Sequence, residues 1–303
     1  IFKGPGFSIL KPPVEKSAIT FSKEGVYDVM VRKLTDGAPY AMGIGSILSA
    51  SKLTFLGASI ESEEACSFVP LSTVTSSNAA IKKRAIDFYG ASDTAGYCVD
   101  GTTKMGPIKY GVEGWEFTNC DYAAAGDLGR NLNAALSVQG YPGVGLTQNA
   151  NSQEQWMLGK LTMAGLYNRT LQTLKSPLGD SPTNKYDIAD EHKRAGASRA
   201  VLISLGGNDY NHQNGHVPSN ATFTSAYVKF LSTLFEAYGY SGNASDPVLA
   251  PPVLISVCGQ GSPQEAKEDP DNNRCRPCPH VEAATKIFKS TVEKATGGKL
   301  RTE

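Results

Sequence analysis

One run of residues constrains the fold more than any other part of this sequence. Residues 200–205 read Ala-Val-Leu-Ile-Ser-Leu and end at Gly206-Gly207. A run that is apolar at nearly every position is typical of a strand buried on both faces, as in a parallel sheet. Residues 252–257 form a second such run, and a shorter one at residues 85–89 ends at Gly90. These runs predict the central strands of one sheet.

Helical patterns alternate with the apolar runs. Apolar side chains recur every three or four residues over 223–235 and again over 280–295, and residues 156–174 also carry helical periodicity. Strands that alternate with helices in this way indicate a parallel sheet with helices on both faces. The sequence therefore predicts an α/β domain over residues 82–303.

The first 80 residues have a different pattern. Residues 27–35 alternate as a strand does, and Asp36-Gly37 follows as a turn signal. Short apolar stretches separated by Gly and Ser continue over 41–56, which indicates several short strands in a β-sandwich. The Ser-, Thr- and Asn-rich stretch 71–78 is the expected linker. We therefore predict a separate β-rich domain over residues 1–81.

Charge and hydropathy exclude some classes of partner. Lys plus Arg and Asp plus Glu number 29 each in 303 residues, so nucleic acid or an anionic membrane is not the expected main partner. No run reaches the length of a membrane span. The sequence begins Ile-Phe-Lys without Met or a signal-peptide pattern, as expected of a processed or trimmed chain. The oligomeric state stays open.

Cysteines and glycosylation signals favour the eukaryotic secretory route, and hence an extracellular protein. Three Asn-x-Ser/Thr sequons begin at Asn168, Asn220 and Asn243. The six cysteines are Cys66, Cys98, Cys120, Cys258, Cys275 and Cys278, an even number that allows 15 pairings. We expect a Cys98–Cys120 disulfide, because these residues bracket one loop, and a disulfide from Cys258 to Cys275 or Cys278. A zinc site at Cys275, Cys278 and His280 is the alternative, although no fourth ligand is evident.

Each predicted strand of the α/β domain ends in residues that could do chemistry. Ser92 follows the run 85–89, and Asn208 follows the run 200–205. The glycine loop 143–145 follows a further strand expected over residues 135–138, and His280 opens the last helix. The carboxyl ends of parallel strands meet at one edge, where open α/β sheets bind their ligands. We therefore expect these four segments to lie together.

The residue types suggest roles in acyl transfer. A serine hydroxyl such as that of Ser92 needs a base, and the ordinary pKa of a histidine such as His280 lies near neutrality. The backbone N–H groups of Ser92 and Gly145 and the side-chain amide of Asn208 could stabilise the oxyanion of a tetrahedral intermediate. These residues form the predicted site, which needs no metal or organic cofactor.

The motifs resemble those of SGNH (GDSL-type) hydrolases, and more closely the two-domain carbohydrate esterases of family 2. Residues 90–101, Gly-Ala-Ser-Asp-Thr-Ala-Gly-Tyr-Cys-Val-Asp-Gly, resemble the family block GDSITAGYGV-G. Residues 143–149 resemble GRGVVRN, and residues 205–210 resemble LGTNDF. The resemblance implies a jelly-roll domain before the hydrolase domain. It also implies removal of acetyl groups from a polysaccharide or glycan through an acyl-enzyme.

Two positions depart from the family pattern. Ala91 stands where the family has an Asp before the nucleophile, and Pro277 stands where it has the acid of Asp-x-x-His. Either a backbone carbonyl orients His280 in a Ser–His dyad, or another acid such as Asp269 or Asp271 reaches the imidazole. The two losses also allow a different class of function, a non-catalytic carbohydrate-binding or structural protein on the same scaffold.

Less specific candidates surround the predicted site. Tyr141, His212 and Trp115 could line the rim of the substrate site, although most aromatic side chains belong to a core. Ser92 could instead be an ordinary turn residue, the glycines could simply form a turn, and Asn208 could cap a helix.

Overall fold

The computed structural model describes eight segments of the chain: residues 84–99, 118–150, 161–170, 181–189, 198–211, 217–239, 252–259 and 277–295. The predicted β-rich domain and its boundary at residue 81 lie outside these segments. Within them the strands are β1 (Arg84–Gly90), β2 (Ala135–Gly140), β3 (Ser198–Gly206) and β4 (Val253–Gly259). The helices are α1 (Ser92–Ala95), α3 (Ala124–Asn131), α5 (Met163–Leu166), α7 (Asn220–Ala237) and α8 (Pro277–Ala295), with a 3₁₀ turn, η2, at Pro182–Asn184.

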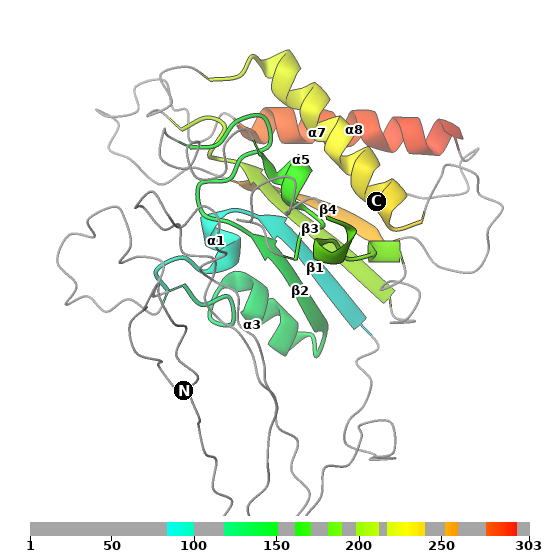
Figure 1. The fold of residues 1–303 in the computed structure, drawn as a ribbon. Coiled ribbons are helices and arrows are strands. Elements are labelled where there is room, and N and C mark those ends of the chain that lie inside the picture. Colours follow the sequence, from blue (N-terminus) through cyan, green and yellow to red (C-terminus); the bar gives the residue numbers. More distant parts are fainter. Residues whose placement is uncertain are drawn as a thin grey trace, which may run out of the picture. The chain divides into compact units, whose positions relative to one another are not determined.

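The four described strands form one parallel sheet in the order β2-β1-β3-β4 (Figure 1). In the register, Gly90 at the end of β1 lies beside Gly140 of β2 and Ser204 of β3. The carboxyl ends of the strands therefore meet at one edge, as the three apolar runs predicted. The α/β architecture is confirmed for this part of the chain.

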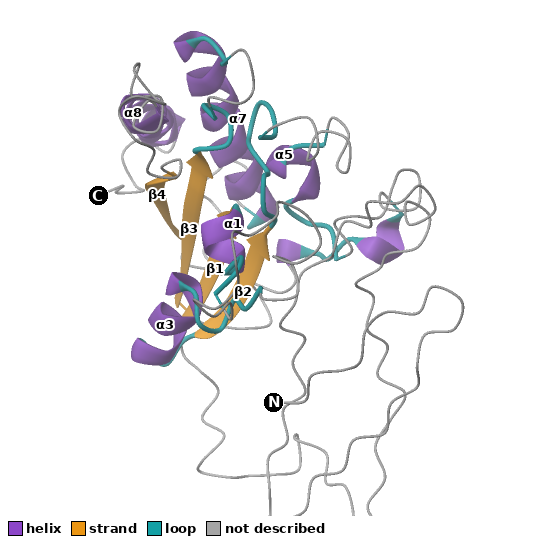
Figure 2. Ribbon diagram, turned by 90° about the vertical axis from the view of Figure 1, so that its left-hand side faces the viewer, coloured by secondary structure: helices purple, strands orange, loops and turns teal. Residues whose placement is uncertain are grey.

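Helices cover both faces of the sheet (Figure 2). On one face Ile86 and Phe88 of β1 pack with Ala125 of α3. On the other face the alternate β1 residue Tyr89 belongs to a larger core with apolar side chains of α5, α7 and α8. Successive side chains of β1 point to opposite faces of the sheet, and both faces are covered by apolar cores. The sequence of β1 is therefore apolar at almost every position.

Two helix predictions have different outcomes. The periodic stretch 223–235 lies inside α7, where Ser219 caps the amino end by accepting a hydrogen bond from the Thr222 N–H at 3.1 Å. The stretch 156–174 does not form one helix, because α5 ends at Leu166 and Arg169 forms an antiparallel bridge with Lys185. Residues 151–160 and 171–180 lie outside the described segments. In the described part of the chain, none of the helices has the length and apolar character needed to span a membrane.

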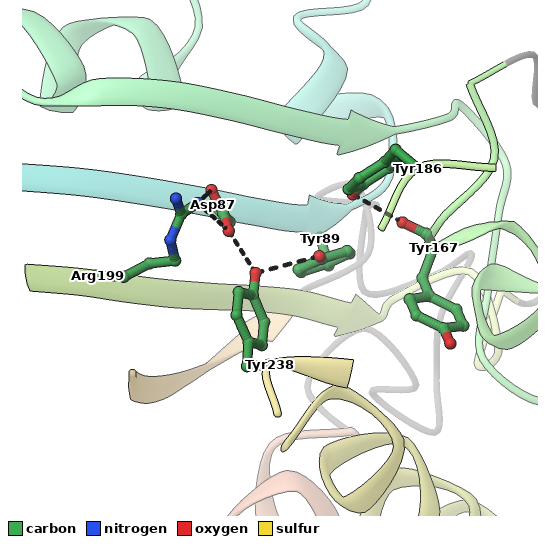
Figure 3. A network of polar contacts seen from close by, with 6 residues as sticks. All are labelled: Asp87, Tyr89, Tyr167, Tyr186, Arg199 and Tyr238. Carbon is green, nitrogen blue, oxygen red and sulfur yellow. Dashed lines mark hydrogen bonds and ion pairs between the residues drawn. The ribbon is translucent and has the colours of Figure 1, made fainter. Parts of the chain in front are cut away.

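A chain of polar side chains crosses the core on the α7 side of the sheet (Figure 3). The guanidinium of Arg199 on β3 lies 2.7 Å from both carboxylate oxygens of Asp87 on β1, and both residues are buried. The Tyr238 hydroxyl donates to the same carboxylate and lies 3.2 Å from the Tyr89 hydroxyl. Burial and the Asp87 charge raise the pKa of Tyr238, so its phenol stays a hydrogen-bond donor. The buried charge of Asp87 therefore has both an ionic partner and a neutral donor.

Candidate active site

Ser92 is the first residue of α1, directly beyond the end of β1. The Ala95 N–H donates to the Ala91 carbonyl at 2.9 Å and the Tyr97 N–H donates to the Ser92 carbonyl at 2.9 Å, which closes a single helical turn. Gly90 leaves room for this turn, because a Cβ there would lie 2.0 Å from Thr94 Oγ1. Ser92 is half-buried, and as the first helical residue its N–H has no acceptor within the helix.

Asp93 holds this turn where Ala91 lacks the expected carboxylate. One Asp93 oxygen accepts from the Thr94 N–H at 2.9 Å, and the other accepts from the Ser204 hydroxyl of β3 at 3.2 Å. Ala91 itself is buried. The carboxylate that ties the turn of Ser92 to the sheet therefore stands at position 93, two residues after Ala91.

The loop after β2 is organised around a buried carboxylate from the loop after β3. Asp209 accepts hydrogen bonds from the N–H groups of Leu146, Thr147 and Gln148 and from the Thr147 hydroxyl, at 2.5–3.2 Å. Burial raises the pKa of this carboxyl, and these donors only partly oppose the rise. Asp209 thus fixes the backbone of residues 146–148.

The position of Gly145 has no room for a side chain, and the Gly145 N–H already has a hydrogen-bond acceptor. A Cβ at Gly145 would lie 1.9 Å from the Gln148 carbonyl oxygen, so this position requires glycine. The Gly145 N–H donates to the side-chain oxygen of Asn149 at 3.1 Å, and the Asn149 amide donates to the Leu161 carbonyl at 2.9 Å. In this structure the Gly145 N–H is therefore directed to a buried side chain.

Asn208 connects the loops after β3 and β2. Its side-chain amide donates to the Val144 carbonyl at 2.7 Å, and the amide is part-buried. Asn208 thus lies beside the glycine loop, at the strand edge where the sequence predicted it.

His280 lies in the first turns of α8, which begins three residues earlier than predicted, at Pro277. Its imidazole stacks on the ring of Tyr210, with the ring centroids 6.1 Å apart and the planes at 24°. Because Tyr210 follows Asn208 and Asp209 in the chain, this contact links α8 to the loop after β3.

The four predicted segments are therefore joined at one edge of the sheet. Asp93 bonds to β3, Asn208 bonds to the loop after β2, and Tyr210 contacts His280. The catalytic roles of Ser92 and His280 stay predictions.

The other candidates have mixed outcomes. Tyr141 is fully buried in the core formed with α5, α7 and α8, so the prediction that it lines a substrate rim is wrong. Its ring packs inward, as most aromatic side chains do. Several candidates lie outside the described residues: Trp115, His212, Asp269, Asp271, Cys66, Cys275 and Asn243.

One of the two predicted disulfides is formed and the other is not. Cys258 of β4 and Cys278 of α8 form a disulfide, which is one of the two expected alternatives. Cys278 is therefore not available for the alternative zinc site, and the described residues contain no cluster of three or more metal-ligating side chains. Cys98 and Cys120 carry thiols, so the expected disulfide between them is not formed. Their segments do run together, since the Asn119 N–H donates to the Gly96 carbonyl, but a disulfide also requires a suitable direction of both Cβ atoms.

Three residues of this edge had no assigned role in the sequence interpretation: Asp209, Asn149 and Tyr210. Each belongs to a block that resembles the esterase family, residues 143–149 or 205–210. The blocks marked these positions, but the pairing of one loop with another is a long-range contact that no local pattern carries.

Several solved structures are similar to this chain at low sequence identity. Neither a protein-family model nor a curated protein sequence matches this chain. A family two carbohydrate esterase from Clostridium thermocellum, solved in complex with cellohexaose, is 20% identical, and the match covers 73% of this chain and 52% of that one, with a TM-score of 0.45. An acetyl xylan esterase from Butyrivibrio proteoclasticus is 16% identical, with 69% and 52% covered and a TM-score of 0.46.

A third similar structure is a family 2 carbohydrate esterase with a carbohydrate-binding domain from Corynascus thermopiles. It is 20% identical, and the match covers 71% of this chain and 67% of that one, with a TM-score of 0.40. This chain spans about half the length of the first two structures. The similar structures thus include carbohydrate esterases of family 2, which is the family that the sequence blocks resemble.

Proposed function

We propose that this chain is a serine esterase that removes acetyl or other short acyl groups from a polysaccharide or glycan. The observation that supports the proposal is the joining of three strand-end loops and α8 at one edge, with Ser92, Asn208 and His280 each carried by a different segment. A site of this composition suits acyl transfer, because it supplies a hydroxyl, a base and neutral donors without a metal.

The proposed reaction has two halves. Ser92 Oγ attacks the ester carbonyl while the imidazole of His280 accepts the hydroxyl proton, and the imidazolium then protonates the departing sugar oxygen. A water molecule attacks the acyl-enzyme with His280 again as base, which releases the carboxylic acid and restores Ser92. The oxyanion of both tetrahedral intermediates is stabilised by the Ser92 N–H and the Asn208 amide.

Gly145 has a conditional place in this proposal. Its N–H would join the oxyanion donors only after Asn149 releases it. The steric demand at Gly145 supports a role in shaping the loop whether or not its N–H meets substrate.

The test compares Ser92→Ala with the wild type on p-nitrophenyl acetate and on acetylated xylan. We expect kcat to fall by roughly 10⁴-fold or more, because the nucleophile is lost. Ser232→Ala on α7, whose hydroxyl donates to the Val228 carbonyl within its own helix, is the matched control and should keep the wild-type rate. Equal slow hydrolysis by the wild type and Ser92→Ala would support the non-catalytic scaffold instead.

We also propose that the protein is secreted and glycosylated. Asn220 is exposed at the start of α7, whereas Asn168 is half-buried beside the fully buried Arg169. Expression in a eukaryotic secretory host should attach a glycan at Asn220, detectable as a glycosidase-sensitive mass shift that Asn220→Gln removes. A glycan at Asn168 would have to be added before the fold closes around Arg169.

A further inference from the structure

The imidazole of His280 has an aromatic neighbour, Tyr210, from the loop after β3. Pro277 occupies the sequence position of the usual acid, three residues before His280. The ring of Tyr210 lies against the imidazole in a stacked arrangement, at 6.1 Å and 24°. A stacked ring restricts rotation of the imidazole about its side-chain bond, which is one of the two tasks of a triad acid.

Tyr210 is itself held firmly enough to serve as a platform. The residue is 1% exposed, and its ring meets the edge of Phe223 at a centroid distance of 5.2 Å. Phe223 packs in turn on Tyr227, another residue of α7. The backbone N–H of Tyr210 donates to the Gly206 carbonyl at 3.2 Å. The platform for His280 is therefore built from β3 and α7, two elements of the main core.

The beginning of α8 is fixed to the sheet by two further contacts. Cys278, two residues before His280, is joined by its disulfide to Cys258 of β4. Pro277 packs on the end of β3, where a Cβ at Gly206 would lie 2.6 Å from Pro277 Cβ. The disulfide and this packing tie the start of α8, and with it the backbone of His280, to two neighbouring strands of the sheet.

We propose that Tyr210 and the Cys258–Cys278 disulfide position His280 for proton transfer. This inference rests on the esterase function proposed above. In the reaction the proton of Ser92 Oγ moves to the imidazole, which becomes a cation, and then to the departing sugar oxygen. The face of the Tyr210 ring is electron-rich and attracts that cation, so the ring favours the protonated imidazole as well as its orientation.

The carboxylates described in these segments have other partners. Asp209 accepts from the amides of residues 146–148, and Asp93 accepts from Thr94 and Ser204. Glu282, on α8 itself, is exposed and pairs with Lys286 at 2.6 Å. The ring of Tyr210 stacks on the imidazole, and Tyr210 is a positioning residue because it acts through His280.

The experiment uses Tyr210→Leu, which removes the aromatic face, and Tyr210→Phe, which keeps it. We expect Tyr210→Leu to lower kcat by about 10-fold to 100-fold with KM nearly unchanged, because misorientation of the base affects the chemical step. Tyr210→Phe should restore kcat. The protein has four histidines, so His280→Gln assigns the His280 resonance in NMR titrations. Tyr210→Leu should lower the pKa of His280, and Tyr210→Phe should return it.

The disulfide is tested with the double variant Cys258→Ser, Cys278→Ser. It should lower kcat with KM nearly unchanged, whereas Cys120→Ser, whose thiol lies outside any disulfide, should not. Near-ultraviolet circular dichroism and thermal unfolding identify any variant that fails to fold. If Tyr210→Leu fails to fold, the double cysteine variant and its Cys120→Ser control carry the test of His280 positioning.

The outcomes separate this inference from the proposed function. Wild-type kcat and an unchanged His280 pKa in folded Tyr210→Leu would overturn the role of Tyr210. If the wild type itself shows no activity beyond that of Ser92→Ala, the esterase proposal fails, and the His280 titration still tests the stacking.

Discussion

Two buried carboxylates on the same sheet are neutralised in different ways. Asp87 lies in the middle of β1, where the guanidinium of Arg199 contacts both of its oxygens at 2.7 Å. Asp209 lies beyond the end of β3, where three loop amides and the Thr147 hydroxyl donate hydrogen bonds to its carboxylate. The first carboxylate joins two strands of the core, and the second joins two loops of the candidate site.

The free-energy cost of burying a charged carboxylate is offset to different degrees in the core and in the candidate site. A paired cation offsets the charge of Asp87 inside the core, where nothing needs to move or bind. Amide dipoles offset the charge of Asp209 only in part, because burial still raises the pKa of that carboxyl. The hydrogen bonds to Asp209 also have a structural effect, because they fix the backbone amides of residues 146–148 beside the glycine loop. We therefore expect changes at Asp87 to affect stability, and changes at Asp209 to affect activity as well.

The largest expected effect is on the core pair. Arg199→Leu leaves Asp87 buried without its cation, which should lower the free energy of unfolding by about 3–5 kcal/mol. Urea unfolding followed by circular dichroism measures the change. The double variant Asp87→Leu, Arg199→Leu removes both charges and should recover much of the loss. If the double variant is as unstable as the single one, packing of the two side chains outweighs their charges.

The core pair could not be predicted from the sequence. Asp87 interrupts an apolar run, and a lone Asp there carries no sign of its partner 112 positions away. The pairing depends on the register of β1 with β3, which places Ala85 beside Arg199 and Asp87 beside Val201. The register depends on the packing of the whole sheet. The existence of a strand depends on its own consecutive apolar residues, and the strands at the apolar runs were predicted correctly.

An intermediate effect is expected at the site carboxylate. Asp209→Asn replaces one accepting oxygen by an N–H₂ group that faces the donors of residues 146–148, which should cost about 1–3 kcal/mol in the free energy of unfolding. The loop should shift, and kcat on p-nitrophenyl acetate should fall further than in Arg199→Leu when both are measured on folded protein. Thr147→Val, which removes only the hydroxyl donor, should be milder in both measurements. Wild-type kcat in Asp209→Asn would remove the contrast between the two carboxylates.

The candidate site was predicted better at its strand ends than in its loops. Buried strands that end in Gly, Ser or Asn mark the edge where the segments meet, so the placement of Ser92 and Asn208 at that edge could be predicted, while their catalytic roles stay predictions. The acceptor for the Gly145 N–H could not, because Asn149 reaches it only when the loop folds back on itself. Tyr141 was predicted wrongly, because its ring belongs to the core.

The smallest expected effect is a pH dependence that belongs to Asp209. Its pKa in the folded protein is raised above the ordinary value of 3.8, so the folded state holds this proton more tightly than the unfolded state does. The protonated group therefore favours folding below pH 3.8, and this contribution is lost as the pH rises through the interval between 3.8 and the raised pKa. Asp209→Asn lacks this titration. As the pH rises from about 3 to 7, the free energy of unfolding of the wild type should therefore fall relative to that of Asp209→Asn.

Urea unfolding at a series of pH values measures this difference, with Asp127→Asn at an exposed position as the matched control. A difference that shifts in favour of the wild type would mean that the amides of residues 146–148 stabilise the carboxylate more than burial opposes it, and the contrast with Asp87 would then be one of geometry alone.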